Sequence, residues 1–176
     1  LQSGSDRILS LMNRGYLMED YYRIVDILRK ELSSFSLSTD LIVGFPGETR
    51  SEYEMTLEAV RNIRFDEAFM YAYSPRRGTA ASSYDDAVDS TEKKSRLSQL
   101  IEIQRSISGE ILQQQVSRVE KTIIERVSKK SARSVMGKTF LNHPIVIPGS
   151  SEDIGEMLTV RIRGVRGSTL QGERIA

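Results

Sequence analysis

The chain has 176 residues, 39% of them hydrophobic, and this composition is typical of folded globular domains. It contains no cysteine, so it can form neither a disulfide nor a thiolate metal site, and its single histidine cannot hold a metal alone. No apolar run approaches the roughly 18 residues of a membrane span, and no signal-peptide pattern is present. We therefore expect the compartment to be the cytoplasm.

The formal net charge of +1 hides an uneven distribution along the chain. Residues 1–116 carry 14 Lys and Arg against 18 Asp and Glu, a net charge of −4, whereas residues 117–176 carry 11 against 6, a net charge of +5. The positive excess in the second segment indicates a polyanionic partner.

The first part of the chain alternates helices with buried strands. Apolar spacing and capping residues predict helices over residues 5–13, 18–33 and 51–63, the third capped by Ser51. Apolar runs predict strands over residues 37–43 and 66–73. A strand, a helix and a strand within about 40 residues form a parallel βαβ unit. The start, Leu1–Ser5, resembles a strand end entering a turn, so we expect a piece of a longer protein.

After a polar loop over residues 75–89, Thr91 is predicted to cap a long helix over residues 92–115. The pattern then changes from helical to alternating. Five short strands are predicted, over residues 119–127, 134–140, 144–147, 157–162 and 169–175. Five short strands in about 60 residues suit a small barrel of the oligonucleotide-binding type. The fold class is therefore α/β followed by all-β.

Ligands of parallel α/β sheets bind beyond the carboxyl ends of the strands. The loops after Leu1, Val43 and Tyr73 should therefore line one site. They contain Leu-Gln-Ser-Gly-Ser, then Gly-Phe-Pro-Gly-Glu preceded by Asp40 in its strand, then Tyr-Ser-Pro-Arg-Arg-Gly-Thr.

These loops, together with Met-Asn-Arg-Gly-Tyr at residues 12–16, have an order and spacing that resemble the radical S-adenosylmethionine methylthiotransferases. The resemblance covers residues 1–79. The basic segment at residues 117–176 resembles the TRAM domain of that family. Its closing Ser-Thr-Leu-Gln-Gly-Glu is closer to the branch that modifies tRNA than to the branch that modifies a ribosomal protein.

The resemblance implies the C-terminal part of a parallel (β/α) radical SAM barrel over residues 1–90, a connecting helix over 91–116 and a TRAM β-barrel over 117–176. It implies a transferase that uses S-adenosylmethionine and 4Fe-4S clusters to add a methylthio group to C2 of an N6-modified adenosine in tRNA. The family carries its cluster cysteines in an N-terminal half that lies upstream of Leu1. Since this chain lacks them, we expect it to be inactive alone, and a non-catalytic tRNA-binding module is the alternative.

The resemblance also implies a set of cofactor-binding residues. Gln2 and Arg14 address the methionine end, where a guanidinium can pair with a carboxylate, and Asp40 accepts from the ribose hydroxyls. The whole implied set is Gln2, Ser3, Arg14, Asp40, Val43, Gly44, Tyr73 and Ser74. The alternative is structural: Arg14 caps a helix, Asp40 bonds nearby backbone, and the glycine-rich loop is an ordinary connection.

A second set of residues is predicted to bind RNA phosphates through positive charge. Its members are Arg76, Lys121, Lys129, Lys130, Arg133, Lys138, Arg161 and Arg163. The alternative is a solvated strand face. Phe140 is the only aromatic residue after Tyr84, so the sequence favours recognition of backbone and shape over base stacking. We assign no catalytic residue and no metal ligand, and we expect His143 in a surface turn.

Overall fold

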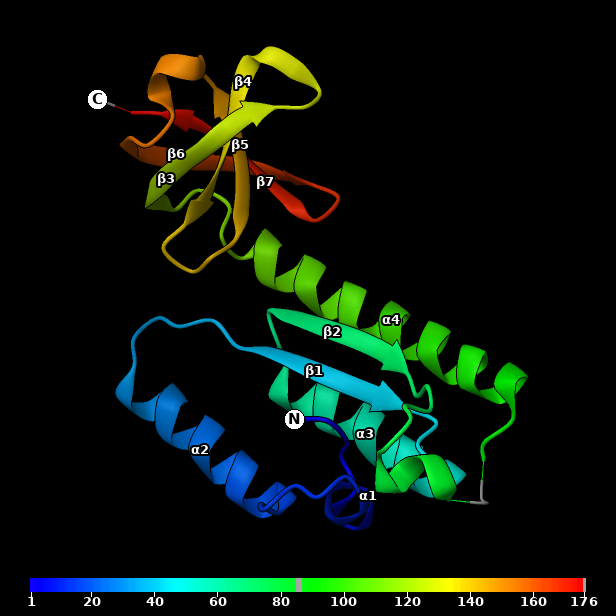
Figure 1. Cartoon of the computed structure of the whole chain (residues 1–176). Coiled ribbons are helices and arrows are strands. Elements are labelled where there is room, and N and C mark those ends of the chain that lie inside the picture. The colour runs from blue at the N-terminus through cyan, green and yellow to red at the C-terminus, as the bar shows by residue number, and fades with distance from the viewer. Residues whose placement is uncertain (85–86, 176) are drawn as a thin grey trace. The chain divides into compact units, whose positions relative to one another are not determined.

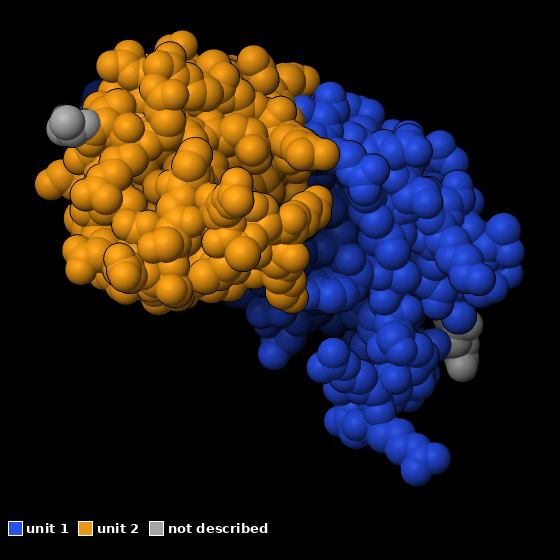
Figure 2. Space-filling model, turned by 90° about the horizontal axis from the view of Figure 1, so that it is seen from above, with its two compact units in different colours: residues 1–107 blue, residues 108–176 orange. Residues whose placement is uncertain are grey.

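The computed structural model describes residues 1–84 and 87–175. The chain forms two compact units, residues 1–107 and residues 108–176, which Figure 2 shows in separate colours. The division falls inside the long helix α4 (Ser90–Gln113), at the position of the predicted connecting helix. Among the described residues, no helix is both long and apolar enough to cross a membrane.

The first unit contains the predicted helices in the predicted order (Figure 1). They are α1 (Asp6–Leu11), α2 (Met18–Glu31), α3 (Arg50–Ile63) and most of α4, with the short 3-10 helix η1 (Ala80–Ser83) inside the loop that precedes α4.

The two caps predicted at Ser51 and Thr91 are each wrong by two residues. Thr49, not Ser51, caps α3, because its side chain accepts from the Glu52 amide while the Glu52 carboxylate accepts from the Thr49 amide. Asp89, not Thr91, caps α4, and its carboxylate accepts from the backbone amides of Thr91 and Glu92. In each case two capping residues stand two positions apart, and the first of them begins the helix.

The strands β1 (Ser38–Val43) and β2 (Glu67–Ala72) pair in parallel, which confirms the βαβ unit. The first residues of the chain run beside β1: the Ile42 amide donates to the Gln2 carbonyl at 3.0 Å, and the Thr39 hydroxyl donates to the Leu1 carbonyl at 2.9 Å. The polar first loop therefore begins at the edge of this sheet.

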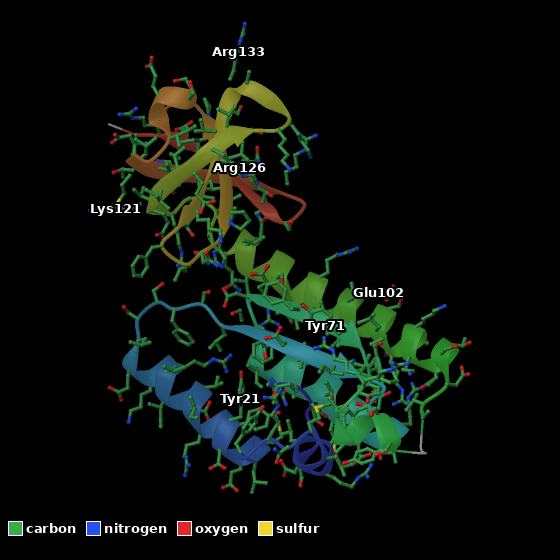
Figure 3. All side chains as sticks on the ribbon, viewed as in Figure 1. Tyr21, Tyr71, Glu102, Lys121, Arg126 and Arg133 are labelled. Carbon is green, nitrogen blue, oxygen red and sulfur yellow. The ribbon has the colours of Figure 1, made fainter. Side chains whose placement is uncertain are left out.

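The two faces of the β1–β2 sheet differ in burial. On one face Leu41 and Val43 are fully buried in the core. The other face is open, since Asp40 and its registered partner Phe69 are both exposed, as is Tyr71 further along β2 (Figure 3). Fully buried side chains of the unit contribute about 1.5–3 kcal/mol each. The largest of them are Ile8, Leu9, Leu41, Tyr53, Leu57, Ile63, Phe65 and Leu100.

The second unit is a closed barrel of five strands in the order β3-β4-β5-β7-β6, which confirms the predicted all-β segment. The strands are β3 (Val119–Ser128), β4 (Ser131–Thr139), β5 (Pro144–Pro148), β6 (Met157–Arg166) and β7 (Thr169–Arg174), with the 3-10 helix η2 (Ser151–Asp153) before β6. Inward residues alternate along each strand and fill one apolar core, into which Leu112 of α4 also packs. Closure removes the sheet edges, so each strand has a neighbour on both sides.

The prediction that His143 lies on the surface is wrong. His143 stands in the turn between β4 and β5, as expected, but it is only 7% exposed. Two hydrogen bonds close the turn: the His143 amide donates to the Thr139 hydroxyl at 3.2 Å, and the Thr139 amide donates to the His143 carbonyl at 3.0 Å.

A buried carboxylate, Glu52, ties the first loop to α3. It accepts from Arg7 Nε and Nη2, both at 2.7 Å, from the Ser5 hydroxyl at 3.1 Å and from the Thr49 amide at 2.9 Å. The Arg7 hydrogen bonds are the main cause that lowers the pKa of Glu52 from 4.5 to about 2. Because the folded pKa is depressed, this stabilisation is fully present above pH 4.5 and is lost as the pH falls towards 2.

We expect Glu52→Gln to lower the free energy of unfolding at pH 7 by about 2–3 kcal/mol, since each pKa unit is worth about 1.4 kcal/mol and half-exposed Arg7 is partly screened. The difference from wild type should shrink at pH 3. Urea unfolding at both pH values measures it. Glu54→Gln, which removes an exposed pair with Arg50, is the matched control and should cost under about 0.5 kcal/mol. Equal losses in the two variants would contradict the assignment.

Candidate functional site

The carboxyl end of β1 leads into a tight loop that begins at Gly44. Its φ of +70° lies in the left-handed region, which side chains other than glycine disfavour. An added Cβ would also lie 2.1 Å from Cγ of Lys93, on α4. The loop therefore requires glycine for two independent reasons, and the side chain of Lys93 covers it.

A buried ion pair fastens this loop to α4. The Glu48 side chain is fully buried, and its Oε2 accepts from the Gly44 amide at 2.7 Å and from Arg96 Nη1 at 2.8 Å. Burial raises the pKa of the Glu48 carboxyl, and the Gly44 amide and Arg96 oppose that shift. Arg96 also donates through Nε to Glu92 at 2.8 Å and lies 5.3 Å from the centroid of the Tyr53 ring. No sequence pattern pointed to the pairing of Glu48 with Arg96.

Aromatic side chains gather at the same edge of the sheet. Tyr73 packs edge-on against Phe45, with 5.1 Å between the ring centroids. The centroids of Phe45 and Tyr84 are 6.2 Å apart, and Lys93 Nζ lies 6.0 Å from the centroid of the Tyr73 ring. The Tyr73 hydroxyl is buried and has no hydrogen-bond partner within residues 1–84 and 87–175. A buried donor without a partner is costly, so this hydroxyl is suited to a ligand. Ser74, the next residue, is exposed.

Three of the predicted cofactor residues lie in one polar neighbourhood beside the open face of the sheet. The Tyr16 hydroxyl donates to Gln2 Oε1 at 3.0 Å, and Arg14 opposes the rise that burial causes in the pKa of Tyr16. The backbone of Leu1 and Gln2 runs beside β1, the strand that carries Asp40, since the Ile42 amide donates to the Gln2 carbonyl and the Thr39 hydroxyl donates to the Leu1 carbonyl. Arg14 and Asp40 are themselves exposed and available to a ligand.

Two other predicted residues have their groups engaged inside the protein. Ser3 is fully buried, and its hydroxyl hydrogen-bonds Thr56 at 3.3 Å and accepts from the Ser5 amide at 3.2 Å. The Val43 side chain is buried, and its carbonyl accepts from the Tyr73 amide at 2.9 Å. These residues shape the loops that carry the polar groups.

The donor set fits one of the two cofactors that the resemblance implies. A guanidinium, a carboxylate and an amide match the carboxylate and ribose hydroxyls of S-adenosylmethionine. An iron-sulfur cluster does not fit, because the chain has no cysteine and its described part contains no group of three His, Asp or Glu residues that could hold a metal.

Seven of the eight predicted RNA-binding residues lie at several places on the barrel. Lys129 and Lys130 form the turn between β3 and β4, and the side chain of Arg133 points outward near that turn (Figure 3). Arg163 is engaged, because it donates to Glu173, whose pKa this hydrogen bond lowers. The remaining positions are Lys121 on β3, Lys138 on β4, half-buried Arg161 on β6 and, in the first unit, exposed Arg76.

Comparison with known families agrees with this division. The model of the Radical SAM superfamily matches residues 1–60, and the model of the TRAM domain matches residues 113–175. The chain thus contains part of a radical SAM domain followed by a TRAM domain.

Two relatives align with nearly the whole chain. A tRNA-2-methylthio-N(6)-dimethylallyladenosine synthase from Methylacidiphilum infernorum is 42% identical over 172 residues, which are 98% of this chain and 37% of that protein. The enzyme of the same name from Moorella thermoacetica is 41% identical, over 99% of this chain and 39% of its own length. The predicted resemblance to the tRNA-modifying methylthiotransferases is confirmed, and the chain spans less than two fifths of these relatives.

We expect Gly44→Ala to lower the free energy of unfolding by about 1–3 kcal/mol through backbone strain, with a further loss from overlap with Lys93. Gly78→Ala is the matched control, since Gly78 has a φ of +83° but no heavy atom near an added Cβ. Lys93→Ala should restore part of the stability of Gly44→Ala. Urea unfolding of the variants measures both effects. Equal losses at Gly44 and Gly78 would contradict the proposed close contact.

Proposed function

We propose that the chain is the C-terminal part of a tRNA methylthiotransferase. In this role it supplies part of the S-adenosylmethionine pocket and an RNA-docking barrel to an enzyme that adds a methylthio group to C2 of an N6-modified adenosine. The observation that carries the proposal is the similarity of about 40% identity, which runs through both units in the same order as in enzymes of that name. The polar neighbourhood of the first unit and the positive charge of the second agree with it.

The first unit, in this proposal, is the C-terminal part of a parallel (β/α) barrel over residues 1–90. The parallel pairing of β1 with β2, and the backbone of Leu1 and Gln2 beside β1, support consecutive strands of such a barrel. The open face with Asp40, Phe69 and Tyr71 is the face that further strands of a barrel would enclose. Residues 91–116 connect this part to a TRAM domain over residues 117–176.

S-adenosylmethionine would bind along the open face and the carboxyl edge of the sheet. Arg14 pairs with the cofactor's carboxylate, Gln2 bonds the same methionine end, and Asp40 accepts from the ribose hydroxyls. The backbone of Val43 and Gly44, with Tyr73 and Ser74, borders the adenine. When bound, the cofactor supplies the methyl and radical chemistry, while these residues bind and orient it.

A tRNA-binding module without catalytic activity of its own is the second candidate. The observation that favours it is the absence of cysteine, since the chain alone cannot hold the cluster that reductive cleavage of S-adenosylmethionine requires. The two candidates share the RNA-binding barrel and differ in the first unit.

We expect the isolated chain, incubated anaerobically with iron and sulfide and then desalted, to retain no 4Fe-4S cluster, because thiolate ligands are absent. Visible absorbance and bound iron measure this. A ferredoxin apoprotein treated in parallel is the positive control. Stoichiometric iron with a cluster absorbance would refute the expectation.

We expect the chain to bind tRNA mainly through phosphates, because its C-terminal segment carries a net charge of +5, from 11 Lys and Arg against 6 Asp and Glu. If about four phosphates are neutralised, log K against log salt should slope by roughly −3. Filter binding across salt concentrations measures the slope.

Lys129→Glu with Lys130→Glu should flatten this slope and weaken all tRNAs alike, since phosphate contacts do not read sequence. The matched control is Lys30→Glu with Lys94→Glu, which makes the same charge change at exposed positions of the first unit. A shallow slope that the barrel variant leaves unchanged would contradict the assignment of the barrel as the RNA surface.

A further inference from the structure

Phe140 is the most exposed of the large hydrophobic side chains in the described chain, at 82%. It stands at the turn between β4 and β5 and is the only aromatic residue after Tyr84. The next residue, Leu141, is only 9% exposed, so the turn buries one apolar side chain and presents the other to solvent. An exposed aromatic ring contributes little to the core and is accessible to a partner that can stack on it.

Hydrogen bonds on both sides of Phe140 hold the turn. The Asn142 amide donates to the Thr139 carbonyl at 2.9 Å, and the His143 amide donates to the Thr139 hydroxyl at 3.2 Å. Asn142 has a φ of 64°, a left-handed conformation that asparagine accepts more readily than most residues. The side chains of Leu141 and His143 are buried, and this burial also stabilises the conformation of the turn. The ring therefore projects from a fixed backbone, and a partner that stacks on it orders only one side chain.

Two lysines stand near Phe140 in the chain and in the register of β3 with β4. Lys138 donates through Nζ to Asn142 Oδ1 at 2.7 Å, and this neutral partner leaves the lysine's charge uncompensated. Lys121 precedes Thr122, which is registered with Thr139 at the base of the turn, and it is exposed. In residues 1–84 and 87–175, neither lysine forms an ion pair. A flat ring near two lysines that form no ion pair matches a nucleobase with its adjoining phosphates.

We propose that Phe140 stacks on an unpaired base of the bound RNA, while Lys121 and Lys138 contact the phosphates beside that base. The proposal rests on the proposed function of the barrel as an RNA surface and adds one base contact to it. It revises the expectation, drawn from the scarcity of aromatic residues, that backbone and shape alone are recognised. Stacking requires a base whose face is exposed, so this contact selects unpaired RNA over duplex. Every base has such a face, so the contact does not read sequence.

The stacking contact is separable from the basic turn. Phe140 and Lys130 lie at opposite ends of β4, whose nine residues rise by about 3.3 Å each, so roughly 30 Å lie between them. Substitutions so far apart act independently. Loss of the ring should therefore change the preference for unpaired RNA without changing the salt slope that the basic turn helps to set.

The test compares the whole chain and its Phe140→Leu variant in binding a stem-loop RNA with an unpaired loop and a fully paired duplex of equal length. Leucine keeps an apolar side chain and removes the flat ring. The variant should bind the stem-loop about 10-fold more weakly, with duplex affinity and salt slope unchanged. Phe140→Tyr, which keeps the ring, should bind as wild type does. Urea unfolding should be equal for all three proteins, because the side chain is exposed.

A direct readout comes from Phe140→Trp, since the chain has no tryptophan and the variant carries a single reporter. Its fluorescence should be quenched by the stem-loop and not by the duplex. Normal stem-loop binding by Phe140→Leu, together with unquenched fluorescence of Phe140→Trp, overturns the stacking contact and leaves the proposed function standing. No salt-dependent RNA binding by the wild type overturns both. Self-association that Phe140→Leu abolishes, without any effect on RNA, assigns the ring to a protein contact and also overturns the proposal.

Discussion

The buried ion pair between Glu48 and Arg96 is the constraint on which the architecture of the first unit depends. Two charges leave water at this point, and hydrogen bonds offset part of their desolvation: Glu48 Oε2 accepts from the Gly44 amide and Arg96, and Arg96 also donates to the Glu48 carbonyl and to Glu92. Removal of either partner would leave an uncompensated buried charge, which costs about 3–5 kcal/mol. The pair joins the loop after β1 to α4, a connection between positions 48 residues apart in the chain. It thereby fixes Gly44, and with it the position of Lys93 over the aromatic cluster at the sheet edge.

Local patterns in the sequence predicted the elements well, and contacts between distant residues account for what was missed. Alternating apolar residues in short segments specify strands, so all five barrel strands were predicted, although β4 begins three residues earlier and β6 ends four residues later than predicted. The cap of α3 was wrong because Thr49 with Glu52 and Ser51 with Glu54 both satisfy the same capping pattern. Only packing decides between such overlapping signals. The partnership of Glu48 with Arg96 and the burial of His143 depend on tertiary contacts that no short pattern contains.

The predicted sites show the same contrast between local patterns and contacts of distant residues. Gln2, Arg14 and Asp40 come from separate segments, and the family motifs were the only sequence signal that linked them. In the structure, Gln2 accepts from Tyr16, two residues from Arg14, and its backbone pairs with β1, which carries Asp40. On the barrel, charge alone could not separate engaged from available cations: Arg163 is bonded to Glu173, whereas Lys129 and Lys130 stand free of ion pairs in the described part of the chain. The small number of aromatic residues led the sequence analysis to disfavour base stacking. The exposure of the single ring of Phe140 could not be predicted from composition.

The central claim is that the two units hold two different ligands, S-adenosylmethionine on the first and RNA on the second. One measurement tests it most directly: amide chemical shifts of the ¹⁵N-labelled chain, recorded during titration with millimolar S-adenosylmethionine and then with a stem-loop RNA. The account predicts that the cofactor shifts amides around Gln2, Arg14 and Asp40, and that the RNA shifts amides around Lys129 and Phe140. Cofactor shifts that are absent or confined to the barrel, or RNA shifts confined to the first unit, would contradict it.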